Sequence, residues 1–228
     1  MHLRLLTLNV WGLPEPVSHA PAARMRAIGE QLGLLDLDAV AFQEVWSREL
    51  GDILAEAGTR AGLVHAWTEG AGRGDGGLVV LSRWPILRAR FEPFLLCGLP
   101  QRLGQMDYWA GKGLASVVVD TPAGELELID THLHAAYGRV GFADEYVGHR
   151  MAEIVQLAHA VATTPLPVVL LGDLNAYAYR AELSVLRRTT GLVDVPWTVG
   201  KAVATVVPHS ASRPNENPPG PRIDYALA

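Results

Sequence analysis

The sequence has almost no cysteine, no long apolar run and no cluster of basic residues. Cys97 is the only cysteine, which excludes an internal disulfide and a zinc site built on thiolates. No apolar run reaches the length of a transmembrane helix. Lys and Arg number 19 against 24 Asp and Glu, for a net charge of −5. Tight sequence-independent binding to DNA needs a basic surface, so this balance argues against a nucleic-acid partner, while leaving room for a local basic groove.

The first residues also lack the basic end, apolar core and small-residue cleavage site of a signal peptide. We therefore expect a mature first strand and a cytoplasmic location. The chain has 228 residues, of which 49% are hydrophobic, which is enough for a sizeable core in one large or two small domains. Because neither a repeat nor a linker is evident, we expect a single domain over residues 1–228.

The apolar pattern predicts an α/β (α+β) fold rich in strands, several of which follow one another with no helix between them. This favours a mixed, largely antiparallel sheet with helices outside over a doubly wound parallel sheet. Strands are predicted at 3–10, 38–46, 63–68, 77–82, 86–91, 112–120, 125–132, 168–171 and 222–227. Helices are predicted at 24–35, 48–58, 144–162 and 182–189. Residues 91–110 have no clear pattern.

The stretch from Val168 to Ala176 organises the rest of the chain. Its apolar, β-branched start is typical of a strand buried on both faces. Asp173 and Asn175 follow it, and residues i and i+2 of an extended chain point the same way. We expect both side chains at one sheet edge, where α/β proteins often place their chemistry. The alternative is a strand that leaves the core through an Asx turn.

Three other predicted strands also end on polar side chains, namely Asn9, Glu44 and His132. A buried strand otherwise avoids such groups, so these ends are expected to converge with Asp173 and Asn175. Carboxylate and carboxamide oxygens suit Mg²⁺ or Mn²⁺ and suit Zn²⁺ poorly. A hard cation beside a histidine and amide donors is typical of phosphate-ester hydrolysis.

Five motifs in this sequence resemble, in the same order, those of the endonuclease/exonuclease/phosphatase superfamily, and they span nearly the whole chain. They are Leu8-Asn9-Val10-Trp11-Gly12, Phe42-Gln43-Glu44-Val45-Trp46, Thr131-His132-Leu133-His134-Ala135, Gly172-Asp173-Leu174-Asn175 and Arg222-Ile223-Asp224-Tyr225. The Asn-Val-Trp of residues 9–11 and the Gly-Lys-Gly of residues 111–113 are most similar to neutral sphingomyelinases. The resemblance implies a four-layer α/β/β/α sandwich of the DNase I-like type, with the site at one end of two sheets. It implies a Mg²⁺-dependent phosphodiesterase, Mn²⁺ being the alternative ion.

The resemblance also implies the metal ligands and the catalytic groups. Glu44 resembles the main Mg²⁺ ligand, with Asn9 beside it. His132 resembles the histidine that contacts the phosphate and assists the leaving group. Asp173 resembles the carboxylate that orients the nucleophile, and Asn175 resembles the donor to the pentacovalent transition state.

Three further residues take roles from the same resemblance. Asp224 resembles the carboxylate that orients the catalytic histidine. Lys112 resembles the sphingomyelinase lysine near the phosphate, although a solvated hairpin lysine would have the same sequence signature. His134 competes with His132 for the phosphate or supports it from behind.

The sequence departs from this family after Tyr225. The family has a further strand carrying Ser-Asp-His, whose histidine is the general base, and no such segment follows in the 228 residues. We therefore expect the last strand of the sandwich to be absent and Asp224 to lack its imidazole. Loss of a general base costs roughly 10²–10⁴ in rate, so we expect weak or no activity. A truncated sequence and a degenerate family member both explain this, and the intact upstream motifs favour truncation.

Three functions remain open at this point. The first is cleavage of a phospholipid head group by water attack at phosphorus. The second keeps the chemistry with another substrate, as in a nuclease or a sugar or inositol phosphatase. The third is a non-catalytic protein that binds phosphorylated ligands or membranes. Tyr108 and Trp109 fit either a peripheral contact with a lipid surface or the core.

Overall fold

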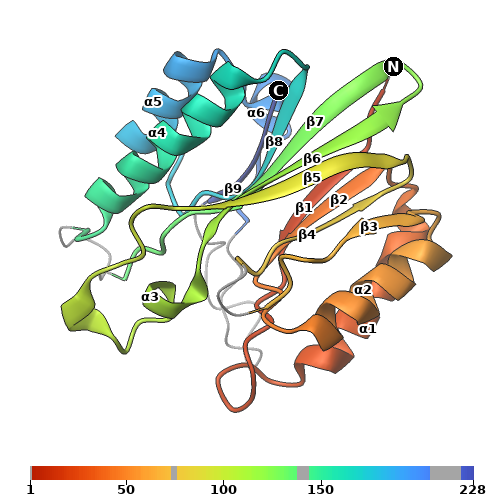
Figure 1. Ribbon diagram of the computed structural model, residues 1–228, viewed down its shortest axis with the longest axis horizontal. Coiled ribbons are helices and arrows are strands. Elements are labelled where there is room, and N and C mark those ends of the chain that lie inside the picture. Colours follow the sequence, from red (N-terminus) through yellow and green to blue (C-terminus); the bar gives the residue numbers. More distant parts are fainter. Residues whose placement is uncertain (1, 73–75, 138–143, 206–221) are drawn as a thin grey trace.

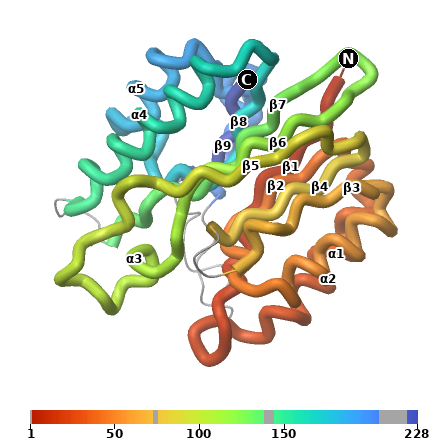
Figure 2. The backbone as a smooth tube through the Cα atoms, in the orientation of Figure 1, coloured from red at the N-terminus to blue at the C-terminus, as the bar shows by residue number. Residues whose placement is uncertain are grey.

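The fold consists of two β-sheets packed face to face, with helices on both outer faces (Figure 1). A computed structural model describes residues 2–72, 76–137, 144–205 and 222–228. Helices α1 and α2 cover the first sheet, and α4 and α5 cover the second on the opposite side of the molecule (Figure 2). The four-layer sandwich predicted from the sequence is therefore confirmed.

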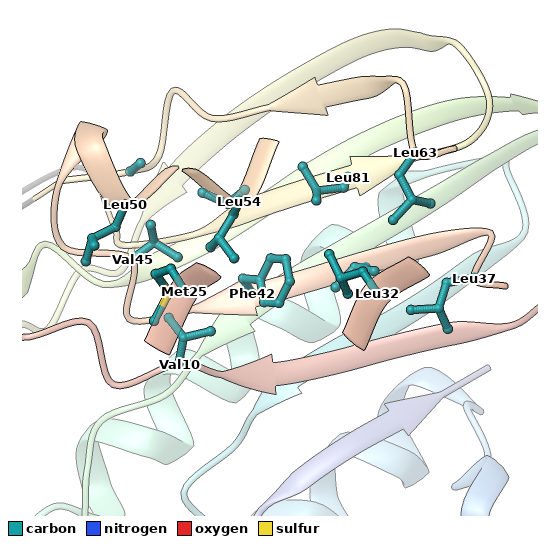
Figure 3. Packing of buried hydrophobic residues seen from close by; sticks show 13 residues of the cluster. Val10, Met25, Leu32, Leu37, Phe42, Val45, Leu50, Leu54, Leu63 and Leu81 are labelled. Atoms are coloured by element: carbon teal, nitrogen blue, oxygen red, sulfur yellow. The ribbon is translucent and has the colours of Figure 1, made fainter. Parts of the chain in front are cut away.

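The first sheet has the strand order β1-β2-β4-β3. Its strands are β1 (Leu5–Asn9), β2 (Ala39–Gln43), β3 (His65–Trp67) and β4 (Val79–Ser82). Strands β1 and β2 are parallel, and the other pairs are antiparallel. Helices α1 (Pro21–Leu35) and α2 (Arg48–Arg60) pack on the outer face through a buried cluster that includes Met25, Leu32, Phe42, Leu54 and Leu81 (Figure 3). Ser47 is the N-cap of α2, and its side chain accepts a hydrogen bond from the backbone N of Leu50 at 3.3 Å.

The second sheet has the order β5-β6-β7-β8-β9. Its strands are β5 (Ile86–Pro93), β6 (Gly113–Thr121), β7 (Gly124–His132), β8 (Val168–Asp173) and β9 (Asp224–Leu227). Only β7 and β8 run parallel within this sheet. Helices α4 (Val147–Thr163) and α5 (Ala181–Thr190) pack on its outer face through a cluster that includes Ile129, Ile154, Leu157, Leu170 and Leu186.

A third apolar layer lies between the two sheets, and it combines small and β-branched side chains such as Ala39, Ala41 and Val117 with larger ones such as Trp67 and Leu128. The polar contacts between the two sheets include one close to the end of this layer. Gln43 Nε2 on β2 donates to Asp130 Oδ1 on β7 at 2.7 Å. Burial raises the pKa of Asp130 well above its usual value, against the opposing effect of the Gln43 hydrogen bond.

The predicted strands at 77–82 and 86–91 both form, but they belong to different sheets. Strand β4 is in the first sheet and β5 is an edge strand of the second, so the turn through Arg83, Trp84 and Pro85 carries the chain from one layer to the other. Of residues 91–110, which the sequence left unassigned, the first three belong to β5. The remainder, 94–110, forms an excursion with a 3₁₀ turn η1 (Pro100–Arg102) and a short helix α3 (Asp107–Ala110). A further short helix, α6 (Val195–Thr198), precedes β9. Within the described residues, no helix combines the length and apolar character that a membrane span requires.

Candidate active site

The polar strand ends meet at one edge of the sandwich. Parallel strands present their carboxyl ends together, so β1 and β2 bring Asn9 and Glu44 side by side, and β7 and β8 pair His132 with Asp173. Strand β9 is antiparallel to β8, so its first residue, Asp224, pairs with Asp173 at this same edge. The site therefore takes its residues from both sheets.

Hydrogen bonds tie the two sheets together at this edge. Asn9 Nδ2 donates to Glu44 Oε1 at 2.7 Å and to Asp173 Oδ2 at 3.0 Å. The second oxygen of Glu44 accepts from Trp46 Nε1 at 3.2 Å, and the Glu44 backbone has φ of +62°. The Asn9 Oδ1 atom accepts from the backbone N of Trp11 at 2.9 Å. The Glu44 carboxylate is thus held from two sides.

His132 lies between these carboxylates and Lys112. Its Nε2 atom is 3.7 Å from Asp173 Oδ2, 4.0 Å from Glu44 Oε1 and 3.0 Å from Lys112 Nζ. Burial, then the positive charge of Lys112, lowers the pKa of His132 well below its usual value. Because an ammonium can only donate, Nε2 is the acceptor and Nδ1 carries the proton of the neutral ring. Among the described residues, that Nδ1 atom has no hydrogen-bond partner.

Asp173, which is buried, pairs with the half-buried Asp224 at the end of the second sheet. Burial, then the charge of Asp224, raises the pKa of Asp173 to about 7, against the hydrogen bonds from Asn9 and the Asn175 backbone. Burial also raises the pKa of Asp224, whose Oδ1 atom has no hydrogen-bond partner among the described residues. The site therefore concentrates negative charge that a cation would stabilise.

Asn175 lies beyond the end of β8, so strand alternation does not place it. Its backbone N donates to Asp173 Oδ1 at 2.9 Å, which is the Asx turn that the sequence left as an alternative. Its Nδ2 atom donates to the carbonyl oxygen of Leu133 at 2.9 Å. Asp173 and Asn175 still line the same pockets, so the turn and the shared site occur together.

The glycine before Asp173 allows β8 to approach β7 closely. Gly172 has φ of +150°, and a Cβ atom there would lie 2.0 Å from the carbonyl oxygen of Thr131. Any side chain at this position would push the two parallel strands apart. The glycine is therefore needed to bring Asp173 level with His132.

Two adjoining pockets open onto this edge and share Trp11, Glu44, Asp173 and Asn175. The smaller, of about 310 Å³, has a polar wall with His132 and Lys112. Its other wall is apolar and is formed by Leu13, Trp46, Met106 and Ala110. The larger, of about 730 Å³, is lined on its far side by Asn9, Arg24, Thr205 and Asp224. One continuous site thus combines a charged floor with an apolar wall.

His134 lies behind the site, since neither pocket has it as a lining residue. Its ring stacks on Tyr146, with ring centres 3.9 Å apart. Its Nδ1 atom is 2.9 Å from the carbonyl oxygen of Ala135. This placement fits the supporting role that the sequence left open and does not favour direct contact with a substrate.

A comparison with protein families matches residues 6–228 to the model of the endonuclease/exonuclease/phosphatase family. The chain belongs to this family. Its sandwich and the position of its candidate site at the sheet edge are those that the sequence resemblance implied.

Two curated relatives are close in sequence. An inositol phosphosphingolipids phospholipase C of Schizosaccharomyces pombe is 32% identical over 203 residues, which cover 86% of this chain and 46% of the relative. Sphingomyelin phosphodiesterase 2 of Homo sapiens is 30% identical over 248 residues, covering 100% of this chain and 56% of the relative. The chain thus spans about half the length of these relatives.

A solved structure supports the fold. A Staphylococcus aureus beta toxin variant with bound magnesium ions superposes with a TM-score of 0.77 at 19% identity, covering 100% of this chain and 83% of the toxin. At this identity the likeness establishes a shared fold, and the residue roles rest on the chain's own geometry.

The donor set of this family member fits a magnesium ion. The Glu44 carboxylate lines both pockets, and Asn9 Nδ2 donates to one of its oxygens and to Asp173 Oδ2. In the described residues no cluster of three or more His, Cys, Asp or Glu side chains is arranged around one point. Mg²⁺ commonly uses one or two carboxylates and keeps several waters, so the Glu44 carboxylate, with the Asn9 amide beside it, is compatible with such an ion.

Sequence reasoning missed Asp107, which contacts Lys112. Asp107 Oδ1 lies 2.5 Å from Lys112 Nζ, and its other oxygen accepts from the Tyr137 hydroxyl. Burial is the largest single influence and would raise the pKa of Asp107, but the charges of Lys112 and His134 and the hydrogen bonds from Lys112 and Tyr137 together lower it. A carboxylate five positions before the lysine in α3 was the available signal, but the segment had no predicted structure to place it.

Proposed function

We propose that this chain is a Mg²⁺-dependent phosphodiester hydrolase that cleaves a phospholipid head group by water attack at phosphorus. One observation carries the proposal. His132 Nε2 lies within 4.0 Å of both Glu44 on the first sheet and Asp173 on the second, beside Lys112 at a shared pocket. The names of the two curated relatives supply the substrate class, since both act on phosphorylated sphingolipids by name.

The cationic and amide groups of the site would bind the phosphate. Lys112 Nζ brings a positive charge to the pocket wall, and Asn175 brings an amide donor beside Asp173. Such donors stabilise the charge that develops on phosphate oxygens in the transition state. Mg²⁺, held by Glu44 and Asn9, would supply further neutralisation of that charge, and Mn²⁺ has the same ligand preference.

His132 and Asp173 would handle protons. The neutral His132 ring offers a protonated Nδ1 and an Nε2 that can take a proton once a substrate displaces Lys112 from it. Asp173, whose pKa is raised to about 7, is suited to orient a water and accept its proton near neutral pH. Asp224 neighbours Asp173 and keeps that pKa high.

The proposal includes contact with a lipid surface beside the pocket. The excursion between β5 and β6 lines the pocket with Met106 and Ala110 and exposes Leu95, Leu103 and Trp109 to solvent, with Leu95 83% exposed. Exposed aliphatic and indole groups favour the interfacial region of a bilayer. A substrate that lies in a membrane would enter the pocket from that side.

The test is release of phosphocholine from sphingomyelin vesicles, measured with Mg²⁺ and with a chelator, alongside nicking of plasmid DNA. The assay uses the 228-residue chain and a version extended by the family's Ser-Asp-His segment. We expect Mg²⁺-dependent release without nicking, and we expect it to be stronger in the extended version.

Other outcomes select the alternatives. Nicking without release would favour the nuclease function, and release of inorganic phosphate from inositol or sugar phosphates would favour a phosphatase. If the extended version is inert in all these assays but binds phosphorylated ligands, the hydrolase proposal is wrong and the binding function is preferred.

A further inference from the structure

One peptide group carries hydrogen bonds to two site residues on one side and to a buried charge on the other. The carbonyl oxygen of Leu133 accepts from Lys112 Nζ at 2.9 Å and from Asn175 Nδ2 at 2.9 Å. The N–H of the same peptide group belongs to His134, and it donates to Glu153 Oε2 at 3.0 Å. A trans peptide is planar, with its C=O and N–H pointing in opposite directions, so holding one end orients the other.

Glu153 lies on α4 and is 1% exposed, so its carboxylate is buried and directed at the strand end. Burial raises its pKa to about 7, and the His134 backbone hydrogen bond is the largest influence that opposes this. A buried carboxyl is costly unless it is hydrogen-bonded. Its principal compensation here is the backbone of the segment that follows His132.

Arg150, one turn earlier on α4, holds the next peptide group. Its Nη1 atom donates to the carbonyl oxygen of His134 at 3.2 Å, and the residue is 2% exposed. Its Nη2 atom contacts Glu182 on α5 at 3.1 Å. The two peptide groups flanking the His134 Cα are thus held by opposite charges from one helix, and the adjacent helix anchors the cation.

We propose that Glu153 and Arg150 are positioning residues that fix the Leu133 carbonyl as the shared acceptor for Lys112 and Asn175. Neither lines the pocket. Arg150 acts through the peptide group between residues 134 and 135, and Glu153 acts through the one between residues 133 and 134. The Glu153 carboxylate also polarises this peptide group, which makes the Leu133 oxygen a stronger acceptor. Without these two contacts the Leu133 carbonyl could rotate, and the Lys112 ammonium and the Asn175 amide would lose the acceptor that they share.

The experiment compares Glu153→Leu and Glu153→Gln with Glu127→Leu. Glu127 is a matched control, because it is also a buried glutamate, 4% exposed, on β7 at the end of the strand away from His132. We expect Glu153→Leu to lower kcat about 100-fold, the effect of misplacing catalytic groups by about 1 Å. Glu153→Gln keeps an acceptor oxygen and should stay within about threefold of the parent.

Activity is measured by the sphingomyelin assay, so this arm rests on the proposed function. Thermal unfolding of each variant separates positioning from stability. Positioning predicts that Glu153→Leu and Glu127→Leu lose similar stability but only the first loses kcat. If the two variants lose activity in proportion to their stability, the positioning role is wrong.

A second measurement is independent of activity. In Glu153→Gln, the NMR signal of the His134 amide proton should move upfield. The chemical shifts of the Leu133 carbonyl ¹³C and of the His132 Nε2 ¹⁵N should change as well. In Glu127→Leu all three chemical shifts should be unchanged. If the His134 amide moves while the Leu133 carbonyl and His132 do not, the peptide does not transmit the contact and the inference fails. If the extended version has no activity but these signals move together, the hydrolase proposal fails and the positioning role stands.

Discussion

The two ends of β7 treat buried polar groups differently. Near its start, Glu127 accepts a hydrogen bond from the Ser116 hydroxyl and lies beside a groove that also contains Arg88 and Arg90. At its other end, His132 leaves Nδ1 without a partner among the described residues, and neighbouring Asp173 has a raised pKa. Both ends of β7 bury polar side chains, but among the described residues only the His132 end has a buried polar atom without a hydrogen-bond partner.

This difference indicates which end carries function. Native proteins satisfy nearly all buried polar atoms, so an exception needs an explanation. The Asp173 and Asp224 carboxyls lie together at the sheet edge with one oxygen unpaired, and a cation and a phosphate would complete their surroundings. The Glu127 end needs no ligand to account for its geometry.

The largest effect is expected from matched changes at the two ends. Glu44→Gln should lower kcat by roughly 10³-fold, because it removes the charge that would hold the metal. The fold should persist, since the amide oxygen can still accept from Asn9. Glu127→Gln should leave kcat unchanged. Steady-state kinetics and thermal unfolding of both variants test this, and equal losses of kcat would remove the distinction between the ends.

A smaller effect is expected when Lys112 is replaced. Lys112→Met should lower kcat by about 10²-fold, the cost of losing one transition-state donor. It should also raise the pKa of His132, because the lysine charge is the second largest cause of that lowered pKa after burial. An NMR titration of the His132 ring measures the shift. A pKa that stays the same or falls further would contradict the assigned contact.

The smallest effect concerns stability at the inter-sheet carboxyl. The pKa of Asp130 is raised on folding, so the folded state holds a proton that the unfolded chain releases above a pH of about 4. Stability must therefore fall as the pH rises from the unfolded pKa toward the folded one. Asp130→Asn removes this slope, so the melting temperature of the variant should gain on that of the parent between pH 5 and pH 8. Parallel curves would show that Asp130 does not titrate in this way.

The sequence predicted most strands and the convergence of their ends, because both depend on local patterns. Apolar runs such as Val168–Leu171 define buried strands, and a polar residue at the end of a parallel strand falls at a shared edge. The ranges differ by a few residues: α1 begins at Pro21 rather than Arg24, and β1 spans Leu5–Asn9 rather than 3–10.

The remaining features depend on contacts that a local pattern does not encode. The sequence of residues 83–85 does not predict that β4 and β5 belong to different sheets. Asp107 acquires its role only when the excursion folds back on Lys112. Glu153 has the same sequence signature as a surface helix residue, and only the packing of α4 against the end of β7 reveals it as buried.

The division of the site between two sheets has a mechanical consequence. Asn9 and Glu44 move with one sheet, and His132 and Asp173 move with the other. Strand residues are spaced by about 3.3 Å. A shift of one sheet over the other by a single residue would therefore break the hydrogen bond between Asn9 Nδ2 and Asp173 Oδ2. Substitutions in the apolar layer between the sheets that shift one sheet against the other would therefore lower turnover before they lower the melting temperature.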